Sequence, residues 1–109
     1  MREKDRQIVK EFKNRIPDEV FRHVRNIVVF GSRARDNAPE ESDLDLMVLV
    51  DETAPGIEEK LEDIAYSVMW DHDFKPIISL KVFTEARFKN ALERGFSFYK
   101  NVEREGIAA

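Results

Sequence analysis

Three short apolar runs, rich in β-branched residues, interrupt a chain of 109 residues that is otherwise highly charged. They cover residues 26–31, 43–50 and 76–83, and runs of this length and composition are typical of buried strands. Segments with apolar residues at helical spacing lie between and around them. Strands that alternate with helices predict an α/β (α+β) fold, in which helices flank a small sheet of about three strands.

The links between these runs constrain the order of the strands. Helical patterns cover about 8–16, 17–24, 57–70, 84–92 and 97–105. The link at 32–42 is polar and contains Pro39, so we expect a loop there, with no crossover helix. A link this short favours an antiparallel pair for the first two strands. The sheet should therefore be mixed.

Length and composition exclude several classes of protein. A chain of this size buries one core, so residues 1–109 should form a single domain. The absence of cysteine excludes disulfides and thiolate zinc sites. No apolar stretch reaches the length of a membrane span, so we expect a soluble, cytoplasmic protein without membrane contact. The net charge of -4 makes non-specific binding to nucleic acid unfavourable.

The acidic residues concentrate in the middle of the chain. Between residues 36 and 73, Lys60 is the only Lys or Arg. Most of these acids are typical of a solvated helix and its loops. Asp43 and Asp45 are different, because they alternate with apolar residues at the start of a predicted strand.

Asp43 and Asp45 are two residues apart, so both side chains should project from the same face of the strand. Two neighbouring carboxylates on an apolar strand repel each other and lose hydration. A cation between them relieves both costs, and carboxylate oxygens suit Mg²⁺ or Mn²⁺. The alternative is a strand end with two solvated Asp side chains.

Gly31 and Ser32 end the first predicted strand. In an antiparallel pair they would lie beside Asp43 and Asp45. Glycine lets a phosphate approach the backbone closely, and the Ser32 hydroxyl and nearby N–H groups can donate to it. The guanidinium groups of Arg33 and Arg35 also match phosphate geometry. In the alternative, Gly31 only ends the strand, and the arginines pair with nearby acids, namely Asp36, Glu40 or Glu41.

The segment GSRARDNAPEESDLDL resembles the signature of the nucleotidyltransferase superfamily related to DNA polymerase beta, and the ending FYKNVEREGI resembles its minimal members. The resemblance implies that fold and the transfer of a nucleoside monophosphate from ATP to a hydroxyl of a protein or RNA. Catalytic roles would fall to Ser32, Asp43 and Asp45, with Mg²⁺ or Mn²⁺ on the two aspartates. Gly31, Ser32, Arg33 and Arg35 would bind the nucleotide.

The same resemblance implies a partner. Minimal members pair with a small helical protein of the HEPN type, as the antitoxin of a toxin–antitoxin system, and self-association stays open as well. Family members usually carry a third carboxylate on the next strand, and here the corresponding position, near Ile77, has none. The domain could be an inactive binding protein that neutralises its partner by forming a complex. It could also work with two carboxylates, or Asp73 or Asp71 could reach in. Lys81 is either a fixed cation that faces the phosphates or a solvated edge lysine.

Overall fold

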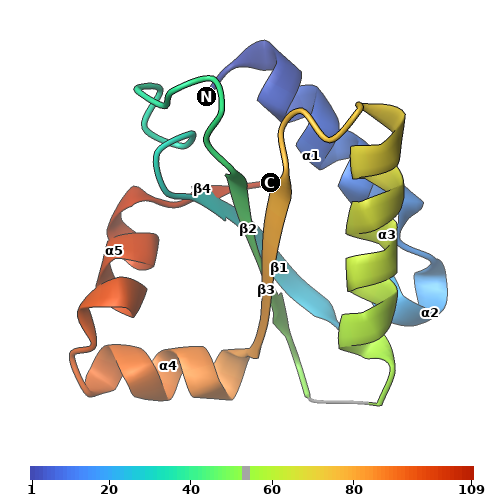
Figure 1. Cartoon of the computed structure of the whole chain (residues 1–109). Coiled ribbons are helices and arrows are strands. Elements are labelled where there is room, and N and C mark those ends of the chain that lie inside the picture. The colour runs from blue at the N-terminus through green and yellow to red at the C-terminus, as the bar shows by residue number, and fades with distance from the viewer. Residues whose placement is uncertain (53–54) are drawn as a thin grey trace.

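A computed structural model describes residues 1–52 and 55–109 of the chain. It is a mixed α+β layer, as the alternation of strands and helices predicts (Figure 1). The elements follow one another as α1 (Glu3–Arg15), α2 (Asp18–Phe21), β1 (Val24–Phe30), β2 (Leu44–Val50), α3 (Ile57–Asp71), β3 (Ile78–Thr84), α4 (Glu85–Glu93), α5 (Ser97–Glu105) and β4 (Ile107–Ala108).

The sheet has the strand order β3-β2-β1-β4. β1 and β2 are antiparallel, as the short link between them predicts, and β2 and β3 are parallel, so the sheet is mixed. β4 is a fourth strand that the sequence did not predict. It pairs antiparallel with β1, with Ile107 opposite Val29, and its two residues are too few to show an alternating pattern.

β1 also starts earlier than its apolar run. Val24 pairs with Val50, and the register shifts between Val24 and Asn26. The short helix expected at 17–24 therefore ends at Phe21. The irregular register breaks the alternation of side chains, which hides this part of the strand in the sequence.

The two faces of the sheet are covered by different helices. Leu44, Leu46 and Val48 of β2 belong to the main core, which also contains buried side chains of α1 and α3. Met47 and Leu49 point to the opposite face, where a smaller cluster includes Val102 of α5 and Phe88 of α4. Figure 1 shows these pairs of helices on opposite sides of the strands. β2 is therefore buried on both faces along most of its length.

α4 begins at a side-chain cap. The Thr84 hydroxyl, at the end of β3, accepts a hydrogen bond from the Arg87 backbone N–H at 3.1 Å and so caps α4.

Among the helices that the structure describes, none combines the length and the apolar character needed to cross a membrane.

Candidate functional site

Asp43 and Asp45 lie where β2 begins. Asp43 directly precedes the strand and is exposed, whereas Asp45 lies within it and is half-buried. Leu44 and Leu46 alternate with them and are fully buried in the main core. The two carboxylates therefore project from the face that also bears Met47, as their spacing predicts.

Gly31 lies against the side chain of Asp45. The register pairs Phe30, the last residue of β1, with Asp45. Gly31 follows with a φ of +74°, and a Cβ at this position would overlap the Oδ2 atom of Asp45. The antiparallel pair thus brings the two predicted motifs together, and the position requires glycine both for its backbone angle and for the space that the carboxylate occupies.

The negative charge of the aspartate pair is poorly compensated. Burial raises the pKa of the Asp45 carboxyl, and the charge of Asp43 raises it further. The Lys81 ammonium and the Ser79 hydroxyl lower this pKa, but it stays above its ordinary value. In the described part of the chain, no Lys, Arg or His forms an ion pair within 4.0 Å of either carboxylate. A set of carboxylate oxygens with excess negative charge fits Mg²⁺ or Mn²⁺.

The segment after Gly31 folds into a tight turn. The Ala34 N–H donates to the Gly31 carbonyl at 3.2 Å, and the Arg35 N–H donates to the Ser32 carbonyl at 3.1 Å. Ser32 is half-buried at the start of this turn, next to the glycine that contacts Asp45. The turn therefore begins beside Asp45, where the resemblance leads us to expect the phosphates.

Arg33 has a different role from the phosphate contact that the sequence suggested. Its side chain is only 5% exposed, and its Nη1 atom lies 3.0 Å from Oδ1 of Asp5, which is buried on α1. Its Nε donates to the Ser42 carbonyl at 2.8 Å, and Nη2 donates to the Glu40 carbonyl at 2.7 Å. The guanidinium therefore fastens the loop between β1 and β2 to α1.

The position of Asp5 in the sequence indicates this ion pair, which the sequence analysis did not predict. Asp5 precedes Ile8, Val9 and Phe12 by three, four and seven residues, so it lies on the apolar face of α1. An acid on the buried face of a helix requires a cation. Asp36, Glu40 and Glu41 are closer in sequence, but the side-chain partner of Arg33 is Asp5.

Arg35 remains at the surface. Its Nη1 lies 2.9 Å from Oε2 of Glu105, on α5, and the side chain is 46% exposed. This ion pair links the loop to α5, which also contributes Phe98 to an edge contact with Phe30 at 5.7 Å between ring centroids. α5 therefore packs on the same face of the sheet as the aspartate pair.

β3 brings no carboxylate to the pair. The parallel register sets Ser79 beside Asp45, and the Leu44 N–H donates to the Ile77 carbonyl at 2.8 Å. Asp71 is occupied elsewhere, because it forms an ion pair with Arg15 at 2.6 Å. Asp73 is exposed in the turn that follows α3. Neither aspartate supplies the third acid in this arrangement.

A cavity of about 600 Å³ lies between the N-terminal residues, the loop before β2 and the segment that leads into β3. Phe74, Pro76 and Ile77 form an apolar part of its lining, and Arg2, Lys4 and Lys75 contribute positive charge. Glu40 and Glu41, which precede Asp43 in the loop, line it as well. Neither Asp43 nor Asp45 lines this cavity, and α1, which contributes Lys4 and Asp5 to it, packs on the opposite face of the sheet.

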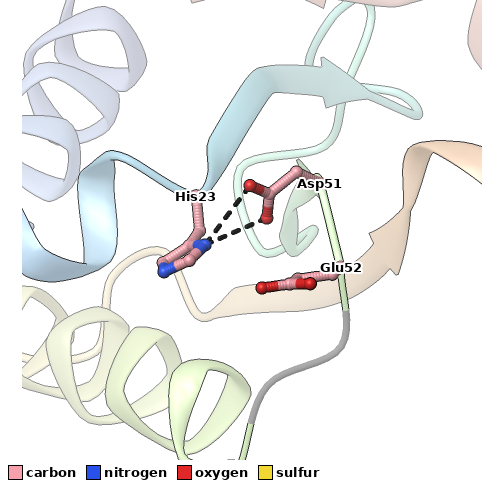
Figure 2. A group of neighbouring side chains, drawn as sticks. All are labelled: His23, Asp51 and Glu52. Atoms are coloured by element: carbon pink, nitrogen blue, oxygen red, sulfur yellow. Dashed lines mark hydrogen bonds and ion pairs between the residues drawn. The ribbon is translucent and has the colours of Figure 1, made fainter.

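A second acidic group lies at the opposite end of β2. His23, Asp51 and Glu52 place three ligand atoms within 4.8 Å of one another (Figure 2). Asp51 lies eight residues beyond Asp43, roughly 26 Å along an extended strand, so this group cannot act on the same ion. Nδ1 of His23 lies 3.1 and 3.3 Å from the Asp51 oxygens. Nη2 of Arg25 lies 3.8 Å from Asp51, so this group has a cation beside it.

Comparisons with known proteins agree on one family. The nucleotidyltransferase domain family matches residues 5–108 of the chain. Two proteins of Methanocaldococcus jannaschii that are named as protein adenylyltransferases are similar to it over nearly their whole length. The first, MJ0141, is 38% identical over 93% of this chain and 94% of its own. The second, MJ0604, is 26% identical over 94% of both.

Solved structures show the same fold. A toxin–antitoxin structure with AMP-PNP has a TM-score of 0.56 at 21% identity and covers 95% of this chain and 70% of its own. A structure of the toxin–antitoxin MntA–HpeT has a TM-score of 0.53 at 19% identity, with the same coverage.

Proposed function

This chain belongs to the nucleotidyltransferase domain family, and we propose that it transfers the AMP group of ATP to a hydroxyl of a protein acceptor. One observation carries the proposal. Asp43 and Asp45 project from one face of β2, and Asp45 packs against Gly31 so closely that a Cβ there would displace its carboxylate. Two relatives that are named as protein adenylyltransferases support the choice of AMP and of a protein acceptor.

Each part of the site would do one task. Asp43 and Asp45 would hold Mg²⁺, which supplies positive charge to the phosphates and favours the departure of pyrophosphate. Ser32 and the N–H groups of its turn would orient the triphosphate. Arg35 could add a charged hydrogen bond by leaving Glu105. Arg33 is left out of this proposal, because its guanidinium already fastens the loop.

The order of the strands supports a direction for the acceptor. In-line displacement requires the attacking oxygen and the leaving pyrophosphate to lie on opposite sides of the α-phosphorus. If the leaving phosphates lie at the end of β1, the acceptor comes from the β3 side of the aspartate pair. A bond then forms between the acceptor oxygen and the α-phosphorus, the bond to the bridging oxygen breaks, and the acceptor proton passes to water.

We further propose that the acceptor is a cytoplasmic HEPN-type protein, with this chain as its antitoxin. The fold shared with two toxin–antitoxin structures supports this pairing. The absence of a carboxylate on β3, within the part of the chain that the structure describes, favours a second candidate function. In that case the domain would neutralise the same partner by binding alone.

One labelling experiment separates these functions. The chain is incubated with Mg²⁺, a HEPN-type protein from the same genome, and ATP labelled at either the α- or the γ-phosphate. We expect the α-label alone on the acceptor. Replacing Asp43 and Asp45 together by Ala should reduce labelling by about 100- to 1,000-fold, because metal-held charge is worth several kcal/mol in the transition state.

The control variant replaces Asp51 and Glu52 by Ala, which removes two acids from the other end of β2. It should label the acceptor like the unmodified chain. Equal labelling by the Asp43→Ala, Asp45→Ala variant would contradict the proposed enzyme. A stable complex without any α-label, unaffected by loss of the aspartates, would establish the binding function instead.

A further inference from the structure

Ser79 and Lys81 of β3, and Ile77 just before the strand, lie on the face of the sheet that carries the aspartate pair. The parallel register sets Ser79 beside Asp45 and Lys81 beside Met47. Ile77, two residues before Ser79, falls on the same face by alternation. This segment therefore offers an apolar group, a hydroxyl and an ammonium where the resemblance leads one to expect a carboxylate.

Lys81 is the cation of β3 that can reach the pair. It is the diagonal neighbour of Asp45, a position that a long side chain can span, and Met47 beneath it is fully buried. Its charge acts on Asp45, where it opposes the effect of burial on the pKa. Across residues 1–52 and 55–109, no acid forms an ion pair with Lys81 within 4.0 Å.

The charges of the site limit how many divalent ions it can hold. Asp43 and Asp45 contribute two negative charges, and Lys81 offsets one of them. One divalent ion between the aspartates and the nucleotide is stabilised by both carboxylates. A second ion would lie toward β3, where Ser79 gives a neutral ligand and Lys81 a repelling charge.

Resting on the proposed function, we propose that this site binds a single divalent ion with the nucleotide, and that the Lys81 ammonium takes the place of the second ion. Lys81 would act on the phosphates as a fixed cation, with Met47 and the backbone of β3 setting its position. The transferase would then hold one divalent ion where a two-metal site holds two, with the same reaction.

The test counts Mn²⁺ ions bound per chain by equilibrium dialysis with electron paramagnetic resonance, at a saturating concentration of a non-hydrolysable ATP analogue. We expect one ion in the unmodified chain and two in Ser79→Asp, which restores an acid beside Asp45. A Glu52→Ala chain is counted in parallel, so that an ion at His23 and Asp51 is recognised. Two nucleotide-dependent ions in the unmodified chain, absent from Asp45→Ala, would overturn the inference.

Affinity for the analogue gives a second readout that does not depend on turnover. Lys81→Gln should bind it about tenfold more weakly, as expected for loss of one charged hydrogen bond. Lys89→Gln removes an exposed charge from α4 and should not change the affinity. An unchanged affinity in Lys81→Gln would overturn the role of Lys81. Binding of Mn²⁺ and analogue that survives loss of both Asp43 and Asp45 would instead overturn the proposed function.

Discussion

The two ends of β2 carry similar acidic residues in opposite electrostatic settings. At its start, Asp43 and Asp45 lie beside Gly31 and Ser79, and no described residue forms an ion pair with them. At its end, Asp51 contacts His23 at 3.1 Å and Arg25 at 3.8 Å. The described residues thus leave the acids at the start of β2 without an ion pair, whereas the acids at its end have Arg25 beside them.

The pKa directions express the same difference. Burial and the charge of Asp43 raise the pKa of Asp45. Partial burial also acts to raise the pKa of Asp51, but the hydrogen bonds from His23 and the Glu52 backbone, with the charges of His23 and Arg25, bring it below its ordinary value. Ionised Asp45 therefore destabilises the empty fold, whereas ionised Asp51 stabilises it. Under the proposed function, the acid that the fold does not neutralise marks the functional end of the strand.

The largest expected effect on stability concerns the loop that brings the functional end together. Arg33→Met leaves Asp5 buried without its partner, so the free energy of unfolding should fall by about 3–5 kcal/mol in urea titrations. Arg35→Met removes an exposed ion pair from the same loop and should change it by less than about 1 kcal/mol.

The double variant Asp5→Leu, Arg33→Met removes both buried charges and should recover much of the lost stability. If Arg33→Met is as stable as Arg35→Met, the buried pair does not hold the loop, and the start of β2 must be positioned by other contacts.

Gly31→Ala tests the contact between β1 and Asp45. The new Cβ overlaps the carboxylate, which must move, so affinity for Mn²⁺ with an ATP analogue should drop by about 10- to 100-fold. Gly95→Ala is the matched control. Gly95 has a similar φ of +77° and lies in a different part of the chain. A Cβ added at Gly95 would be 3.8 Å from its nearest neighbouring atom. Both variants should lose about 1–2 kcal/mol of stability from backbone strain.

Equal affinity in the two glycine variants would contradict the account. It would mean that the left-handed backbone alone determines the glycine, and that Asp45 can hold an ion from another position.

Asp45→Asn and Asp51→Asn should change the stability of the empty chain in opposite directions. At pH 7, Asp45→Asn should raise the free energy of unfolding by roughly 0.5 kcal/mol. The effect is small because the carboxylate is partly exposed and screened. Asp51→Asn should destabilise, because the amide cannot replace the charge that His23 and Arg25 contact.

The pH dependence gives the sign of each effect. Ionised Asp45 lowers the free energy of unfolding, and this loss develops as the pH rises from the ordinary pKa of 3.8 through the raised pKa. The stability gained in Asp45→Asn therefore disappears in acid. The Asp51 contribution is present above 3.8 and is lost as the pH falls through its lowered pKa. Thermal unfolding between pH 3 and 7 measures the stability changes of both variants. Changes of the same sign in Asp45→Asn and Asp51→Asn would contradict the proposed difference between the two ends of β2.

The local parts of the site could be predicted from the sequence, whereas the contacts between distant segments could not. Alternation along β2 placed Asp43 and Asp45 on one face, and the short link to β1 brought Gly31 beside them. The partner of Arg33 lies 28 residues away, and a solvated loop arginine and a buried one look alike in sequence. The two residues of β4 carry no periodicity of their own and pair only because β1 leaves an open edge.

Thermal unfolding with and without Mn²⁺ and a non-hydrolysable ATP analogue tests most directly that the functional end is the start of β2. At about 100 times Kd, binding should raise the Tm of the unmodified chain and of the Asp51→Asn, Glu52→Gln variant by about 10 °C. The Asp43→Asn, Asp45→Asn variant should show no rise. A rise that survives in Asp43→Asn, Asp45→Asn and is lost in Asp51→Asn, Glu52→Gln would place the site at the other end of the strand and contradict the account.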